Sequence, residues 1–429
     1  MFAALKARDF RLLWSGQAVS FLGDQFHLIA LPWLVLTLTH DPVQLGIVLA
    51  LAGIPRASLM LLGGAYADRH SPRTIMLVSD VLRLVLVAGL AAATIAGSVQ
   101  MWMVYLLALA FGVVSGFFTP AAEAALPRLV DGEHLESGNA LMMGVDQLAS
   151  FAGPAAAGTL IALFGAAHGA TTRASLPGIG AAFMVDAATF AVSAATLWMI
   201  HSLPALGAGS DAHPLAAVAE GLRYAASVPA FRWLFAMIAS ANFLLIGPLT
   251  VGVPVLAQSR FAEGALAYGI IIAAYGLGNL GGMLAGASLP RPAARVFSTV
   301  VVALFVGFGV VIAAFGLVRS AWLGAAMIGV LGLGNGYIAV ILMSTIQRLT
   351  PKEMLGRFMS LVMLAMLGVT PLSQAIAGLV VKAGPGPLFF GAGVAMTMLG
   401  VFAGLRRDSW SLDRFEDGAV SRDELPEAA

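Results

Sequence analysis

The chain has no cysteine and very little charge. Without cysteine it can form no disulfide, use no thiol nucleophile and hold no Cys-ligated metal. Asp, Glu, Lys and Arg make up 10% of its 429 residues, whereas soluble proteins carry about a quarter. The hydrophobic share is 59%, and the mean hydropathy is +0.91. These values indicate a polytopic membrane protein.

Signatures of several other classes are missing as well. The net charge is +1, and no basic cluster is large enough to bind nucleic acid. The sequence has no nucleotide-binding loop, metal-ligand cluster or catalytic dyad, so we expect no cofactor, no metal and no enzyme. A membrane enzyme acting on lipid would need His, Asp or Cys clustered at one bilayer face, and the acids here are scattered. A receptor or scaffold without a transport cycle is a further alternative.

Long apolar stretches organise the whole chain. A bilayer-spanning helix needs about 20 mostly apolar residues. In the first half, stretches of this kind run over 11–38, 43–66, 74–97, 101–120, 140–165 and 179–200. In the second half they run over 231–257, 266–289, 296–318, 321–346, 358–382 and 386–405. The expected fold is therefore an all-α membrane protein with twelve transmembrane helices.

Cations divide unequally between the loops on the two sides of this predicted bundle. With the N-terminus inside, the outer loops hold only Arg173, Arg260, Arg319 and Lys382. The inner segments hold Lys6, Arg8, Arg11, Arg69, Arg73, Arg128, Arg223, Arg291, Arg295, Arg348, Lys352, Arg357, Arg406, Arg407, Arg414 and Arg422. Because Lys and Arg concentrate in cytoplasmic loops, both termini are predicted to be cytoplasmic.

The two halves of the chain repeat one another at a nearly constant spacing. The recurring pairs are Phe10-Arg11 with Phe231-Arg232, Gly64 with Gly286, Arg73 with Arg295, and Gly112 with Gly332. Two six-helix halves related along the membrane normal are typical of one transporter architecture, in which the substrate site lies between the halves. The expected organisation is a six-helix bundle over 1–200, a cytoplasmic linker over 201–230, a second bundle over 231–405 and a disordered cytoplasmic tail over 406–429.

One charged stretch interrupts the apolar spans, from Gly63 to Arg73, with the sequence GGAYADRHSPR. Its glycines let a helix end approach a neighbour closely. Asp68, Arg69 and His70 follow where water begins, since such charges are costly deeper in lipid. Glu123, at the inner end of the fourth span, either joins Asp68 and Arg73 in a charge network or is a solvated acid.

The same stretch resembles the loop between the second and third helices of major facilitator superfamily transporters, a G-x-x-x-D-R-x-G-R-R pattern. The matching residues are Gly64, Asp68, Arg69 and Arg73. Ser71 and Pro72 stand where that family has Gly and Arg. By this resemblance, the four matching residues belong to a cytoplasmic gate.

Three more stretches are similar to the macrolide and siderophore exporters of that superfamily. They read FRLLWSGQAVSFLGDQFHLIALPWLVL in the first span, FFTPAAEAALPRLVDGEHLESGNAL after the fourth, and EGLRYAASVPAFRWL in the linker. The resemblance implies a transporter that exports an amphipathic small molecule from a bacterial cytoplasm, driven by protons.

Asp24 is the acid that the sequence places deepest in the first span. It lies about thirteen residues into the span, near the midplane at a rise of about 1.5 Å per residue. A carboxylate at that depth is costly, so we expect it to have a function. With His27 and Gln17 on the same face, it either exchanges a proton during transport, forms a static ion pair with Arg56, or only packs. Arg56, in the second span, is either that counter-ion or a binding group for an anionic substrate.

Other polar residues within the spans are structural or line the cavity. Asp80 and Arg83 are three residues apart on one helix face and are expected to pair. Asp146 and Asp186 need partners that the sequence does not identify. The remaining candidates for the cavity wall are Asn242, Asn279, Asn335 and Gln374.

The fifth span contains Gly153, Pro154 and Gly158, which resemble the G-P-x-x-G-G element of antiporters. Pro154 removes one backbone hydrogen bond, and small neighbours allow close packing. The element either bends the helix and limits leak, which favours exchange, or is a packing face with no bearing on direction.

The sequence thus favours a proton-coupled exporter in the bacterial plasma membrane that rocks its two halves around a midplane cavity. We expect a monomer whose partners are protons, a small-molecule substrate and the lipid bilayer. Uptake by the same fold is the main alternative.

The topology can be tested directly. A reporter fused after Ala429 should be active only in the cytoplasm, and a cysteine placed at Gly169 should be labelled from outside. Labelling of that cysteine only after permeabilisation would contradict twelve spans in this orientation.

Overall fold

The computed structural model describes residues 3–166, 176–201, 203, 229–290, 294–349, 362 and 365–406. Most of the predicted linker over 201–230 and the predicted tail beyond Arg406 lie outside the described residues. The domain boundaries at these segments therefore stay predictions.

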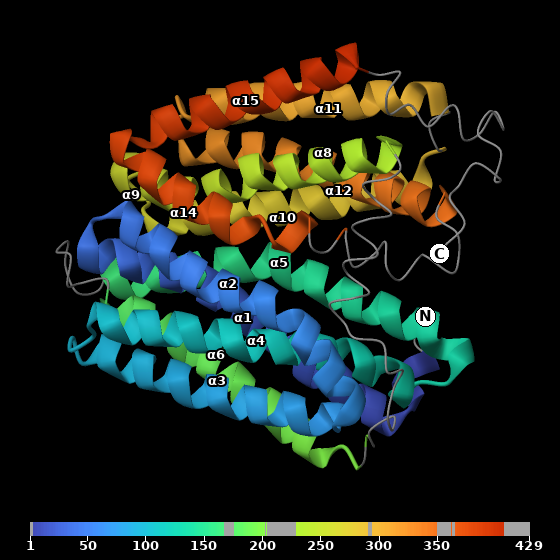
Figure 1. Cartoon of the computed structure of the whole chain (residues 1–429). Coiled ribbons are helices and arrows are strands. Elements are labelled where there is room, and N and C mark those ends of the chain that lie inside the picture. The colour runs from blue at the N-terminus through green and yellow to red at the C-terminus, as the bar shows by residue number, and fades with distance from the viewer. Residues whose placement is uncertain are drawn as a thin grey trace.

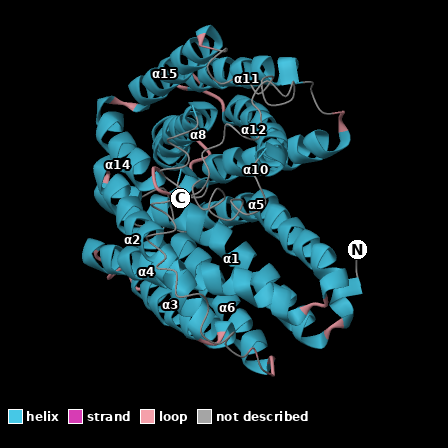
Figure 2. Ribbon diagram, turned by 45° about the vertical axis from the view of Figure 1, so that its right-hand side comes forward, coloured by secondary structure: helices cyan, strands magenta, loops and turns pink. Residues whose placement is uncertain are grey.

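The described residues form helices joined by short connections (Figure 2). The first half contains η1 (Ala3–Lys6), α1 (Arg8–Thr39), α2 (Pro42–Arg69), α3 (Pro72–Ile95), α4 (Met101–Leu129), η2 (Gly132–His134), α5 (Leu135–Ala166) and α6 (Leu176–Met199). The second half contains α8 (Pro229–Gly247), η4 (Pro248–Gly252), α9 (Val253–Arg260), α10 (Ala265–Ser288), α11 (Ala294–Phe315), α12 (Ala321–Leu349), α14 (Thr370–Val380), η5 (Val381–Ala383) and α15 (Pro385–Leu405). Within the described residues, 12 helices are long and apolar enough to cross a membrane, which confirms the predicted fold class.

Local chemistry explains where helices begin and bend. Asp41 precedes α2, and its side chain accepts a hydrogen bond from the backbone N–H of Val43, while Pro42 occupies the first turn. The seventh span is not one regular helix. Pro248 and Pro254 lack backbone N–H donors, and a π-helical turn over Pro248–Gly252 separates α8 from α9.

Each half packs as its own bundle, with the first half in blue to green and the second in yellow to red (Figure 1). In the first half α1 packs on α5 and α6, α2 on α4, and α3 on both α4 and α6. In the second half α10 packs on α12, and α11 packs on α15. We call the end of the molecule at Arg8, where α1 begins, the near end, and the end at Thr39, where α1 finishes, the far end.

The halves touch mainly through two helix pairs, α5 with α10 and α2 with α14. Gly158 lies against Gly269, where a Cβ on Gly158 would be 2.7 Å from the carbonyl oxygen of Ala265. Gly46 lies against Gly378 in the same way, with a Cβ on Gly46 only 2.9 Å from a backbone oxygen of α14. All four glycines lie toward the far end of their helices. Glycine is required here because any side chain would separate the two backbones.

A substitution at one of these contacts should open the far end. In Gly269→Val, the new side chain would collide with the carbonyl oxygen of Pro154, and overpacking of this kind costs about 1–3 kcal/mol. We expect a lower melting temperature and faster labelling of a single cysteine at Thr250 by an impermeant maleimide added at the far side.

Gly281→Val in the same helix is the matched control, because Gly281 is exposed and a Cβ there meets no atom within 4 Å. Equal labelling in the two variants would show that the contact at Gly269 does not seal the far end.

Candidate functional site

A cavity of about 650 Å³ is hollowed into the first half, and we call it the large cavity. Its polar lining comprises Gln17, Asp24, Gln25, His27, Arg56, Arg83, Ser115, Thr119, Glu123, Asn139 and Asp146. These residues come from α1 to α5, and several belong to the near-end turns of α4 and α5. In a chain with so few charges, this is a marked concentration of polar and charged side chains.

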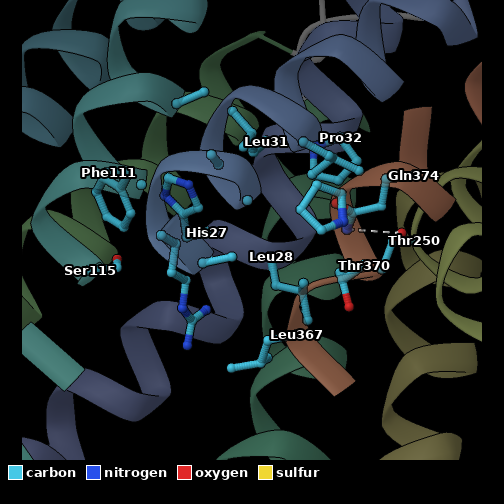
Figure 3. A pocket seen from close by; sticks show the side chains of 18 of the residues that line it. His27, Leu28, Leu31, Pro32, Phe111, Ser115, Thr250, Leu367, Thr370 and Gln374 are labelled. Atoms are coloured by element: carbon cyan, nitrogen blue, oxygen red, sulfur yellow. Dashed lines mark hydrogen bonds between the residues drawn. The ribbon is translucent and has the colours of Figure 1, made fainter. Parts of the chain in front are cut away.

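A second space of about 220 Å³, the small cavity, adjoins the first and lies between the halves. Five residues line both: His27, Leu28, Arg56, Phe111 and Ser115. Figure 3 shows His27 and Phe111 on one side of the small cavity and Thr370 and Gln374 on the other. Gln374 donates to the hydroxyl of Thr250 at 3.3 Å, so the second half supplies neutral polar groups where the first supplies cations.

Asp24 lies about midway along α1 and is half-buried on the wall of the large cavity. Among the described residues, none forms a hydrogen bond or an ion pair within 4.0 Å with its carboxylate. The static pair with Arg56 therefore does not form in this conformation. Gln17, on the same helix, is buried and donates to the hydroxyl of Ser193 instead.

His27 supplies the partner that the sequence could not assign to Asp186. Its Nδ1 lies 3.1 Å from Oδ2 of Asp186, whose side chain is fully buried in α6. The imidazole also stacks on Phe111 with the ring centroids 4.6 Å apart. His27 is thus held between a buried acid and the cavity, whereas Asp186 itself does not line the cavity.

Asp80 and Arg83 pair as predicted, at 3.8 Å, with both side chains almost completely buried. Arg83 also donates to the hydroxyl of Ser115 at 3.1 Å. Its guanidinium lies 4.2 Å from the ring centroid of Phe118, which adds a cation–π contact. The sequence missed Ser115 and Phe118 because they come from α4, about one span further along the chain.

Comparisons with known proteins agree with this architecture. The family described as Major Facilitator Superfamily matches residues 13–372. The chain belongs to the Major Facilitator Superfamily. It is therefore a multi-pass membrane transporter, and the alternative of a membrane enzyme that acts on lipid is rejected.

Relatives of stated function are distant in sequence. The multidrug efflux pump Tap of Mycolicibacterium fortuitum is 26% identical over 89% of this chain and 91% of Tap. The enterobactin exporter EntS of Escherichia coli O139:H28 (strain E24377A / ETEC) is 27% identical over 81% of this chain and 79% of EntS. Among solved structures, a POT family transporter in complex with 5-aminolevulinic acid has a TM-score of 0.71 at 13% identity, covering 94% of this chain and 97% of that one. This last likeness shows the fold alone.

The superfamily motif lies at the near end, where α2 ends and α3 begins. Arg73 donates from Nε to the carbonyl of Leu197 at 2.8 Å and from a terminal nitrogen to that of Trp198 at 2.6 Å. It thereby satisfies the open carbonyls at the C-terminus of α6. Pro72 takes the first position of α3, so the departure from the family pattern still gives a helix start.

The charge network expected between Arg73 and Glu123 does not form in this conformation, because the guanidinium of Arg73 bonds to carbonyl groups of α6. Glu123 is exposed on the wall of the large cavity and pairs with no described residue. Arg69 is exposed, and Gly64 has open space around its Cα. The side chain of Asp68 lies outside the described residues, so its role stays a prediction.

The α5 element contributes to packing on both sides. Gly153 lies against the side chain of Gln25 in α1, while Pro154 and Gly158 contact α10. The packing face proposed from the sequence is therefore present, and its bearing on transport direction stays a prediction.

Amide side chains connect the second half to the first. Asn335 of α12 donates to Asn279 of α10 at 3.2 Å, and Asn279 lies 3.5 Å from the side-chain oxygen of Gln147 in α5. Asn242 donates to the carbonyl of Ile238 and lines a separate apolar pocket of about 140 Å³ within the second half. Asp146 is half-buried and lines the large cavity. Of the predicted cavity amides, only Gln374 lies at the space between the halves.

The buried Asp80–Arg83 pair makes a specific prediction about stability. Asp80→Leu leaves Arg83 buried without a counter-charge, and loss of one partner of such a pair costs about 3–5 kcal/mol. The double variant Asp80→Leu/Arg83→Met removes both charges and should recover most of the melting temperature, measured on purified protein.

Asp9→Asn is the control, because Asp9 pairs with Arg8 at an exposed site, where pairs contribute about 0–1 kcal/mol. If the double variant melts no higher than Asp80→Leu alone, the unpaired charge of Arg83 is not the cause of the lost stability.

Proposed function

We propose that this transporter exports an amphipathic small molecule in exchange for protons, with Asp24 as the proton-carrying group. The observation that carries the proposal is an acid without a fixed partner on the wall of a large cavity. Asp80 and Asp186 are each held by a cation or an imidazole, whereas Asp24 has no such partner among the described residues. It is therefore free to gain and lose a proton within the cycle.

The surroundings of Asp24 suit exchange. Charge is disfavoured in a bundle surrounded by lipid, so a carboxylate there gains a proton when no cation faces it. Arg83 and Arg56 line the same cavity, and their positive charges attract an ionised carboxylate. A substrate that enters the cavity changes the balance between the protonated and ionised forms of Asp24. Release of the proton on one side of the membrane can then be coupled to binding of the substrate.

Alternating access would arise from rocking of the halves. The far end is closed by glycine contacts, while the large cavity reaches residues of the near end. Closing the near end would require the near-end turns of α4 and α5 to approach the second half, and opening the far end would separate Gly158 from Gly269. Gly64, Asp68, Arg69 and Arg73 lie at the end that must close, which fits a gating role for this motif.

We further propose that the protein is a monomer in the bacterial plasma membrane, with both termini in the cytoplasm. The unequal distribution of cations supports this orientation, and Tap and EntS are bacterial proteins. The near end is then cytoplasmic, and the structure represents the inward-facing state.

Export is favoured over uptake by the printed functions of two relatives, a multidrug efflux pump and an enterobactin exporter. The close contact of Pro154 and Gly158 with α10 favours exchange over leak and does not distinguish export from uptake. Uptake by the same fold is the alternative. Accumulation in inverted vesicles compared with whole cells separates the two directions.

Asp24→Asn tests the proton-carrying role. The amide resembles the permanently protonated acid, so downhill movement of substrate through the cavity should survive. Uphill movement driven by a pH gradient should fall to background, because nothing then couples the two fluxes. Both fluxes are measured in proteoliposomes with a substrate found by screening amphipathic antibiotics and siderophores in a strain without its own exporters.

Arg56→Gln and the double variant Asp24→Asn/Arg56→Gln serve as controls for a structural role. If Asp24→Asn lowers the melting temperature and the double variant restores it, the residue belongs to an ion pair formed in another state of the cycle. Full pH-driven accumulation by Asp24→Asn would falsify the proton-carrying role.

A further inference from the structure

Arg56 is a cation without a partner in the small cavity. Its side chain is exposed, and among the described residues none accepts a hydrogen bond from it or pairs with it within 4.0 Å. The sequence left open whether Arg56 is a counter-ion of Asp24 or binds an anionic substrate. The fold adds a second cation, since Arg83 of α3 lines the same large cavity as Arg56.

The described residues that line the small cavity include no acid. The acids of the large cavity, Asp24, Glu123 and Asp146, do not line it. Within the part of the wall that the structure describes, a negatively charged group would therefore meet a guanidinium and no carboxylate.

Hydrogen-bond donors remain available on both sides of this cavity. Ser115 accepts from Arg83 and still has its own proton to donate. Gln374 donates one amide hydrogen to Thr250 and has a second. By contrast, the hydroxyl protons of Thr250 and Thr370 are already given to backbone carbonyls. Arg56 and Ser115 belong to the first half and Gln374 to the second, so donors line the cavity from both halves.

We propose that the small cavity binds an oxyanion, such as a carboxylate, of an amphipathic substrate, with Arg56 as its principal partner. Apart from these groups, His27 and Tyr268, the described wall is apolar, including Leu31, Leu49 and Pro371, and suits the apolar part of the same molecule. The planar fork of Arg56 matches a carboxylate with two parallel hydrogen bonds. This inference rests on the proposed function, since it names the substrate class for that cavity.

The test compares two probes that differ only in charge, N-dansylglycine and its uncharged amide. Binding to purified protein in dodecyl maltoside is followed by dansyl fluorescence, so the readout does not depend on proton coupling. We expect the native chain to prefer the carboxylate by about tenfold or more, as for hydrogen bonds to a charged group. Arg56→Gln should reduce this ratio to about one, and Arg56→Lys should restore part of it.

Arg319→Gln is the control, because Arg319 is exposed and lies outside both cavities. Should Arg56→Gln fail to fold, a single cysteine at Thr370 in an otherwise native chain gives a second readout. The carboxylate, and not the amide, should slow its labelling by maleimide.

Equal binding of both probes to the native chain would overturn the proposal, as would a preference that persists in Arg56→Gln. Displacement of the probe by phosphatidylglycerol would assign the site to a lipid phosphate instead of a substrate. If the native chain shows no pH-driven transport but still prefers the carboxylate probe, proton coupling is refuted and the oxyanion site is retained.

Discussion

Backbone contact between glycines at one end of the bundle is the constraint on which the rest of the structure depends. Gly158 with Gly269, and Gly46 with Gly378, bring helices of opposite halves so close that no side chain fits between them. Because lipid offers no hydrophobic drive for helix association, such contacts must come from close packing and hydrogen bonds. The halves can therefore be joined tightly at the far end while they stand apart around a cavity nearer to the other end.

Charge is distributed to match this arrangement. In the first half, Asp80 lies 3.8 Å from Arg83, and Asp186 lies 3.1 Å from the imidazole of His27. Asp24 and Arg56 face the cavities instead and lack such partners among the described residues. The second half presents amides and hydroxyls to the small cavity, and its own pocket around Asn242 is lined mainly by Met, Phe and aliphatic side chains. One half thus supplies the titratable and cationic groups, and the other a neutral surface against which a substrate can bind.

The sequence predicted the fold because span length, loop cations and a repeat of about 220 residues are properties of the chain itself. It also predicted the Asp80–Arg83 pair, since residues three positions apart lie on the same face of any α-helix. It could not predict that His27 bonds to Asp186, or that Arg73 caps α6, because these partners lie more than a hundred residues apart and only packing brings them together. For the same reason it left the role of Arg56 open, because the neighbouring cation, Arg83, comes from another helix.

Distances between spin labels at the two ends test most directly whether the halves rock about this interface. One pair, at Glu136 and Ser288, spans the halves at the near end, and another, at His40 and Lys382, spans them at the far end. In lipid nanodiscs, the account predicts two populations, in which a shorter distance at the near end accompanies a longer one at the far end. Their ratio should change with pH in the native chain and not in Asp24→Asn. A single population at both ends at every pH, or distances that lengthen together, would contradict alternating access by rocking.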